Sequence, residues 1–196
     1  MADAIFVNTC AIRDHAEEKI HSQLGRFALL KKEKPETIIG VLGCMAQNLK
    51  HDLLENRPFV DIVLGPDSYR RIPELLKRKN TQKNSIVDTT LSRYEVYDGL
   101  FPHRDDKGVN AWISIMRGCD KFCTFCIVPF TRGRERSRSK NSILDEVQKA
   151  VDAGYSEVTL LGQNVNSYLY NELNFENLLQ SIAKIPSLKR IRYTSH

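Results

Sequence analysis

The sequence of 196 residues lacks the features of membrane and secreted proteins. No apolar run approaches the roughly 18–20 residues that are needed to cross a bilayer. No basic segment followed by an apolar one opens the chain as a leader. The chain has five cysteines, an odd number whose clustering argues against a disulfide framework. These absences predict a cytoplasmic protein without a membrane partner.

Acidic residues are scarce in one stretch of the chain. Between Arg117 and Lys140, seven basic residues are opposed only by Asp120 and Glu135, so this stretch alone accounts for the formal charge of +5. An isolated basic run is usually a solvated loop, but this one overlaps a cysteine motif, which favours a bound polyanion such as RNA. Alternate residues of an extended segment share one side. The predicted phosphate contacts are Arg132, Arg134, Arg136 and Arg138.

The cysteine motif has the spacing C-x3-C-x2-C and consists of Cys119, Cys123 and Cys126. Three thiolates in one tight loop suit a [4Fe–4S] cluster and leave one of its four irons without a protein ligand. The alternative is a zinc knuckle with a fourth ligand such as His103. Zinc sites usually pair two arms of C-x2-C or C-x2-C and H-x3-H type, and the sequence lacks a second arm. The pattern therefore favours the iron–sulfur cluster.

The first 85 residues alternate strand and helix patterns. Short apolar runs predict strands at residues 4–9, 37–42 and 60–64. Helical patterns follow them at about residues 14–34, 47–55 and 67–78, and Asp67 is the expected N-cap of the last helix. Continuous apolar strands between helices indicate a parallel sheet. Cys10 and Cys44 each follow a strand, at the edge where such sheets bind ligands, and are candidate metal ligands as well as plausible small buried residues.

The predicted organisation is a domain at residues 1–85, a linker at 86–108 and a second domain at 109–196. In the second domain, strands are expected at 112–116, 158–161 and 191–194, and helices at about 141–153 and 175–185. This alternation is typical of the first βα units of a TIM-type barrel, whose chemistry gathers after the strands. The fold class is therefore α/β in both domains, with the cysteine motif following the first barrel strand.

Five stretches of the chain resemble the methylthiotransferases of the radical S-adenosylmethionine class. The cysteine core is typical of the whole superfamily, and the last stretch favours the members that modify tRNA over the relative that modifies a ribosomal protein. The resemblance covers nearly the whole chain and is carried by Asn8–Arg13, Gly43–Gln47, Ser114–Cys119, Cys123–Gly133 and Leu160–Tyr168.

The resemblance implies a [4Fe–4S] cluster on Cys119, Cys123 and Cys126 that binds and reductively cleaves S-adenosylmethionine. It implies that the resulting radical activates carbon 2 of an N6-prenylated adenosine next to the tRNA anticodon, and that electrons come from a flavodoxin- or ferredoxin-like donor. A second cluster in the N-terminal domain supplies the sulfur, and Cys10 and Cys44 match two of its three ligands. The expected cofactor-binding residues after the barrel strand are Gly162, Gln163 and Asn164.

The chain also departs from the family pattern. The family's first N-terminal cysteine has no counterpart in residues 1–9, and the N-terminal sheet and the barrel both look incomplete. We therefore expect a fragment that forms one cluster rather than two and whose separate activity is doubtful. Two alternatives remain open: a methylthiotransferase for another tRNA adenosine or a ribosomal protein, and a non-catalytic iron–sulfur or zinc module that binds RNA.

Overall fold

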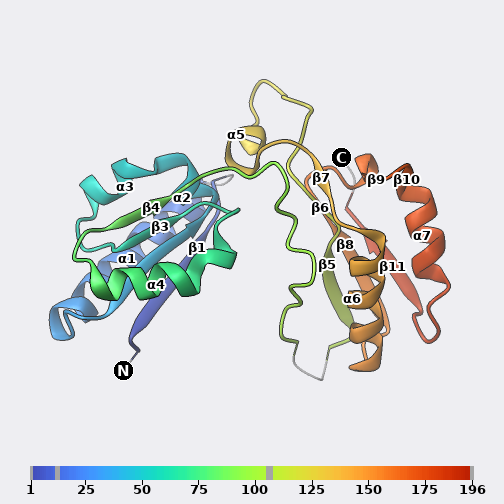
Figure 1. Cartoon of the computed structure of the whole chain (residues 1–196), viewed down its shortest axis with the longest axis horizontal. Coiled ribbons are helices and arrows are strands. Elements are labelled where there is room, and N and C mark those ends of the chain that lie inside the picture. The colour runs from blue at the N-terminus through green and yellow to red at the C-terminus, as the bar shows by residue number, and fades with distance from the viewer. Residues whose placement is uncertain (1, 12–13, 105–107, 195–196) are drawn as a thin grey trace. The chain divides into compact units, whose positions relative to one another are not determined.

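The structure is a computed structural model that describes residues 2–11, 14–104 and 108–194, with the backbone alone described for residues 14–17 (Figure 1). The chain forms two compact units. The N-terminal unit comprises Met1–Ser92 together with Thr124–Arg132, and the C-terminal unit comprises Arg93–Cys123 together with Gly133–His196. Over the described ranges, no helix is both long enough and apolar enough to cross a membrane.

The N-terminal unit is built on a parallel sheet whose strands lie in chain order. Its strands are β1 (Ala4–Thr9), β2 (Ile38–Gly43), β3 (Ile62–Leu64) and β4 (Ile86–Asp88). Ala4 pairs with Ile38 and Thr9 pairs with Gly43, so β1 and β2 end at the same level. Because the middle strands are almost wholly apolar, they are buried on both faces, as parallel strands usually are.

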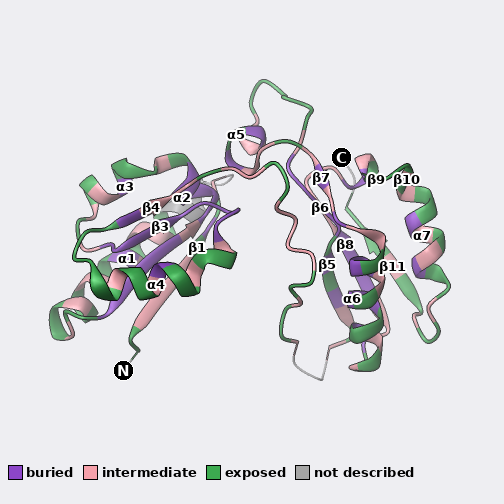
Figure 2. Cartoon of the chain, viewed as in Figure 1, coloured by how far each residue is buried: buried purple, intermediate pink, exposed green. Residues whose placement is uncertain are grey.

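Helices cover both faces of this sheet. Alternate residues of β2 point to opposite sides, with Ile39 and Val41 in one core and Ile38 in another. The first core is closed by α1 (Asp14–Glu33), α2 (Cys44–Leu49) and α3 (His51–Asn56), and the second by α4 (Ile72–Thr81). Figure 2 shows the buried strands in purple between helices whose outer faces are exposed and green.

Three local features differ from the sequence-based expectation. The single helix expected at 47–55 is two helices, because Lys50 has a φ of 51° and interrupts the helical path between α2 and α3. Asp67 does not cap α4: its carboxylate accepts a hydrogen bond from the Ser92 N–H at 3.0 Å, and a short 3-10 turn leads into α4, with proline in the first turn. The expected linker also contains β4, whose short length hides it from periodicity.

The C-terminal unit contains a second parallel sheet, with strand order β11, β8, β5. The strands are β5 (Asn110–Ser114), β8 (Glu157–Leu161) and β11 (Arg190–Tyr193), and they are connected through α6 (Lys140–Asp152) and α7 (Phe175–Ala183). Both helices pack on one face of the sheet in one core, which includes Ile113, Val147 and Ile182. The α/β class with parallel sheets is therefore confirmed in both units.

Short elements complete the chain. β6 (Met116–Arg117) and β7 (Arg136–Ser137) form an antiparallel pair, as do β9 (Leu169–Tyr170) and β10 (Leu173–Asn174). The segment with the cysteine motif lies between β6 and β7 and includes α5 (Val128–Arg132). The motif thus follows the first strand of the second sheet, at its carboxyl edge, as the sequence predicted.

Candidate functional site

The two ends of the cysteine segment lie side by side in the C-terminal unit. Arg117 of β6 pairs with Arg136 of β7, and the Cys119 N–H donates a hydrogen bond to the Gly133 carbonyl at 3.1 Å. Gly118 is buried at a φ of 76°, where a Cβ atom would collide with the Arg134 carbonyl. Only glycine fits this position without strain. We call residues 116–120 together with residues 133–137 the neck.

The two acidic residues of the basic stretch meet across the neck. The Glu135 N–H donates to Asp120 Oδ1 at 3.1 Å, and the Asp120 N–H donates to Glu135 Oε1 at 3.4 Å. Asp120 Oδ1 also pairs with Arg134 Nε at 2.7 Å. The scarce acidic side chains therefore join the two sides of the cysteine segment immediately after Cys119.

The loop after β8 reaches the same neck from the sheet. Gln163 Oε1 accepts a hydrogen bond from the Gly118 N–H at 2.7 Å. Asn164 Nδ2 donates to Glu135 Oε1 at 3.1 Å and also to Ser167 Oγ. A Cβ atom at Gly162 would lie 2.5 Å from Met116 Cγ, so glycine allows this close approach. Two of the three residues expected to bind a cofactor thus hold both sides of the neck by their side chains.

All five cysteines are free thiols. Cys119 is partly buried and Cys123 exposed in the C-terminal unit, whereas the partly buried Cys126 belongs to the N-terminal unit. In the portion of the chain that the structure describes, no three His, Cys, Asp or Glu side chains are grouped so as to hold a metal ion. The donor set itself, three unpaired thiols within eight residues of sequence, has the chemistry that an iron–sulfur cluster requires.

The four arginines predicted to follow a phosphate backbone do not form one exposed row. The Arg134 side chain is 72% exposed, but Arg136 and Arg138 are only 8% and 3% exposed. The extended segment ends after Ser137, and Arg138 donates to Glu146 Oε2 at 2.6 Å inside the unit. Arg136 and Arg138 therefore do not belong to an exposed row, whereas the Arg134 side chain, which pairs with Asp120, is open to solvent.

Arg138 belongs to a buried charged network. Its guanidinium also donates to the Ser114 carbonyl at 2.7 Å, and Arg104 pairs with the other oxygen of Glu146 at 2.5 Å. The Tyr168 hydroxyl donates to the Arg138 carbonyl at 2.8 Å. Burial is the main cause that raises the pKa of Tyr168, with a smaller contribution from the negative charge of Asp98. The network joins α6, β5 and the loop that carries Gln163.

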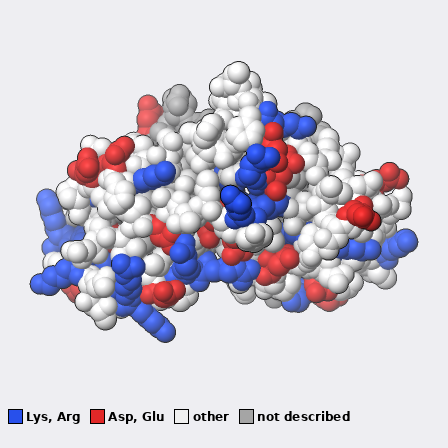
Figure 3. Space-filling model, turned by 45° about the horizontal axis from the view of Figure 1, so that its top comes forward, with Lys and Arg blue, Asp and Glu red and all other residues white. Residues whose placement is uncertain are grey.

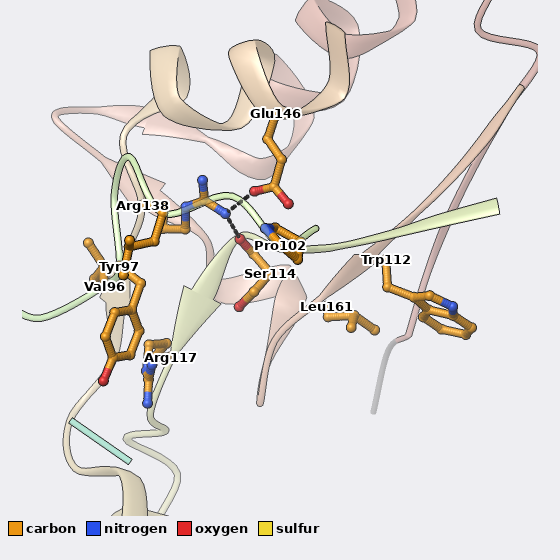
Figure 4. A pocket seen from close by; sticks show the side chains of 10 residues that line it. Val96, Tyr97, Pro102, Trp112, Ser114, Arg117, Arg138, Glu146 and Leu161 are labelled. Atoms are coloured by element: carbon orange, nitrogen blue, oxygen red, sulfur yellow. Dashed lines mark hydrogen bonds and ion pairs between the residues drawn. The ribbon is translucent and has the colours of Figure 1, made fainter. Parts of the chain in front are cut away.

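A pocket of about 210 Å³ lies beside this network, and Figure 4 shows its lining. Trp112 and Ser114 line it from the face of β5 that the helices leave open, and Leu161 lines it from the end of β8. The Arg117 guanidinium lies over the Tyr97 ring, 4.5 Å from its centre. The pocket is thus at the carboxyl end of the strands, on the side of the sheet where barrel enzymes bind their substrates.

The edge of the N-terminal sheet carries the other two cysteines. Cys10 and Cys44 directly follow Thr9 and Gly43, which are paired, so each comes immediately after the end of one of two neighbouring strands. Cys10 is exposed and Cys44 is buried, and the Arg132 Nε donates to Cys44 Sγ at 3.2 Å. Arg132, expected to bind RNA, therefore contacts a candidate metal ligand within the N-terminal unit.

Sequence reasoning missed most of the neck. Asp120 and Glu135 were the only acids in the basic stretch, and this isolation was the available signal for a structural role. Nothing in the sequence pairs Gln163 with Gly118. On the face drawn in Figure 3, Lys and Arg side chains are interspersed with Asp and Glu, so the neighbours of each arginine, rather than the net charge, decide what it is free to bind.

Comparisons with known proteins bear on both units. Residues 1–65 match the Uncharacterized protein family UPF0004, and residues 113–195 match the Radical SAM superfamily. The tRNA-2-methylthio-N(6)-dimethylallyladenosine synthase of Amoebophilus asiaticus is 49% identical over 100% of this chain and 43% of its own length. The proteins of the same name from Bacteroides thetaiotaomicron and Bordetella pertussis are 49% and 46% identical, each over 99% of this chain and 44% of their own length.

The chain therefore spans less than half the length of these curated relatives. Among solved structures, the radical S-adenosylmethionine methyltransferase TsrM from Kitasatospora setae matches 91% of this chain and 39% of its own, with a TM-score of 0.58 and 14% identity. At that identity the likeness concerns the fold alone, and it agrees with parallel α/β units followed by barrel-type βα units.

Proposed function

We propose that this chain, which belongs to the methylthiotransferase family of radical S-adenosylmethionine proteins, acts in adding a methylthio group to carbon 2 of an N6-prenylated adenosine near the anticodon of tRNA. One observation carries the proposal: the chain is 49% identical over its full length to a relative named for this reaction. The cysteine motif lies inside the stretch that matches the radical SAM superfamily.

Cys119, Cys123 and Cys126 are the proposed ligands of a [4Fe–4S] cluster, because three free thiols at this spacing suit three of its four irons. When bound, the cluster supplies the single electron that cleaves S-adenosylmethionine, and a flavodoxin- or ferredoxin-like protein is the proposed donor. The contribution of the chain itself is to position the motif at the neck, where the Cys119 N–H donates a hydrogen bond to the Gly133 carbonyl. The proposed site for S-adenosylmethionine is beside this loop, on the side where Gly162–Asn164 approach it.

Cys10 and Cys44 are proposed as two of the three ligands of a second cluster, at the carboxyl edge of the N-terminal sheet directly after the paired residues Thr9 and Gly43, and we still expect this chain to form only the cluster of the motif. Arg132 supports this proposal by placing a cation and an N–H donor on Cys44 Sγ at 3.2 Å. Hydrogen bonds to cluster sulfurs are one of the means by which proteins tune such centres.

The proposed macromolecular substrate is tRNA. Arg134 supports this assignment, because its side chain is 72% exposed at the neck, directly beside the cysteine segment. A phosphate held there would bring the nucleic acid to the reacting centre, and such contacts act through charge without reading sequence.

The test is anaerobic reconstitution of the chain with iron and sulfide, followed by metal analysis and mass spectrometry of prenylated tRNA incubated with S-adenosylmethionine and a reductant. We expect about four irons per chain, which corresponds to one cluster, and no zinc. Cys123→Ala should remove the cluster of the motif, while Cys10→Ala, its matched control, should retain it. Zinc in place of iron, or equal loss of the cluster in both variants, would show that the assignment is wrong.

A further inference from the structure

We propose that Gln163 is a positioning residue for the cysteine motif: its side chain holds the neck at Gly118 and thereby fixes Cys119 for cluster binding. The expected effect on cluster binding rests on the proposed function, whereas the hydrogen bond between Gln163 and Gly118 does not. The family resemblance pointed to Gly162–Asn164 as cofactor-binding residues, whereas the structure assigns the Gln163 side chain to the protein's own backbone.

The argument begins with a buried backbone group. Gly118 is buried, and its N–H donates to Gln163 Oε1 at 2.7 Å. A buried N–H without a partner costs free energy comparable to a lost hydrogen bond. Because β6 ends at Arg117, the ladder with β7 does not extend to this residue, and Gln163 supplies the acceptor.

The next residue along the chain is the first cysteine of the motif. The Cys119 N–H donates to the Gly133 carbonyl at 3.1 Å. Two consecutive amides are thus held, one by the loop after β8 and the other by the returning side of the neck. Together they fix the backbone from which the Cys119 thiol projects, while Gly118, at a φ of 76°, makes the turn between β6 and the cysteine.

Asn164 holds the opposite side of the neck. Its Nδ2 donates to Glu135 Oε1 at 3.1 Å, and the Glu135 N–H donates to Asp120 Oδ1. Gln163 and Asn164 are adjacent in sequence and reach opposite sides of the neck, so movement of the loop after β8 moves both sides together. Groups that orient metal ligands without touching the metal typically change metal affinity by about 10–100-fold when mutated.

The experiment compares three variants of the full chain. Gln163→Met keeps the length of the side chain and removes the acceptor, and Gln163→Glu keeps an acceptor. Gln180→Met is the matched control, because Gln180 is exposed on α7 and hydrogen-bonds Glu176. The first measurement is amide hydrogen exchange at Gly118 in the metal-free chain, read by NMR.

We expect exchange at Gly118 to become about fivefold faster in Gln163→Met, which corresponds to one hydrogen bond of about 1 kcal/mol, and to stay unchanged in the other two variants. If Gln163→Met unfolds the C-terminal unit, Gln163→Asn replaces it, since its shorter side chain withdraws the acceptor. Unchanged exchange at Gly118 in a folded variant overturns the inference.

The second measurement is iron release to a chelator and the EPR spectrum of the reduced cluster. We expect Gln163→Met to release iron at least about fivefold faster with an altered EPR line shape, and Gln163→Glu to behave like the parent chain. Faster amide exchange with unchanged iron release and EPR would reduce Gln163 to a purely structural residue and overturn the inference. A parent chain that takes up no iron would refute the proposed function, while hydrogen exchange would still decide whether Gln163 holds the neck.

Discussion

Replacing Glu146 by alanine should strongly destabilise the C-terminal unit. The Glu146 side chain is 2% exposed and lies between Arg138, which is 4% exposed, and Arg104, which is 13% exposed. Its two oxygens meet the two guanidinium groups at 2.5 and 2.6 Å. Removing the carboxylate takes the shared partner from both guanidinium groups and leaves Arg138 with the Asp98 carboxylate alone, at 3.4 Å.

The magnitude follows from the burial of the partners. Breaking a buried pair by removing one partner typically costs about 3–5 kcal/mol, because the remaining charge stays desolvated. For a domain of about 60–100 residues, each kcal/mol lowers the melting temperature by about 4–8 °C. We therefore expect Glu146→Ala to lower the melting temperature of this unit by at least about 12 °C. Glu146→Gln keeps the shape of the side chain and one acceptor, so its melting temperature should lie between those of the parent and Glu146→Ala.

The assays are thermal unfolding, which gives the melting temperature, and urea unfolding, which gives the free energy of unfolding. Both are followed by the fluorescence of Trp112, which is the only tryptophan of the chain and lies on β5 of the same unit. Far-UV circular dichroism reports both units together. Asp145→Ala is the matched control: Asp145 is exposed on the same helix, and surface changes usually stay within about 0.5 kcal/mol. A loss of less than about 1 kcal/mol in Glu146→Ala would refute the view that this carboxylate balances two buried cations.

Three further predictions concern the neck, alkaline stability and tRNA. Gly118→Ala should abolish iron retention, because its Cβ atom would meet the Arg134 carbonyl. In Gly154→Ala the residue has a φ of 92° and no atom lies within 4 Å of the added Cβ, so this variant should cost only the backbone strain of about 1–2 kcal/mol and keep its iron, as iron analysis after reconstitution would measure. Burial raises the pKa of Tyr168, so the stability that its neutral hydroxyl contributes is complete below the unfolded pKa of about 10 and is lost as the pH rises through the folded value. Above about pH 10, the stability of Tyr168→Phe, followed by circular dichroism, should therefore fall less steeply with pH than that of the parent. Arg134→Ala should lower the salt slope of tRNA anticodon stem–loop binding by about one unit, whereas Arg190→Ala, whose side chain is 57% exposed on β11, should leave the slope unchanged, and equal effects would count against the neck as the RNA contact.

The sequence by itself was sufficient for the features that depend on local pattern. Apolar runs and helical periodicity predicted the parallel α/β class, since the burial of strands and helix faces is written in residues close together in the chain. The ends of strands were predictable for the same reason, and Cys10 and Cys44 directly follow Thr9 and Gly43, which are paired. The spacing of Cys119, Cys123 and Cys126 is likewise a property of consecutive residues.

Some local features escaped pattern reasoning because they depend on single backbone conformations. Lysine is not a residue type that predicts a positive φ, so the φ of 51° at Lys50 was not expected and the two helices were predicted as one. β4 has three residues, too few for periodicity to reveal, and its pairing with β3 is what defines it as a strand. Asp67 carries the signature of a helix cap, but a hydrogen-bond donor 25 residues away occupies its carboxylate.

Only the tertiary structure decided which polar side chains are available for chemistry. In sequence, Arg134 and Arg138 belong to one basic run, yet Arg138 is buried because Glu146 on α6 offers it a carboxylate, while Arg134 remains exposed. Gln163 looked like a ligand-binding residue, and the 45 residues that separate it from Gly118 conceal their hydrogen bond. Charge and hydrogen-bonding capacity are properties of residue types, but their partners are set by the packing of the chain, which brings distant residues together.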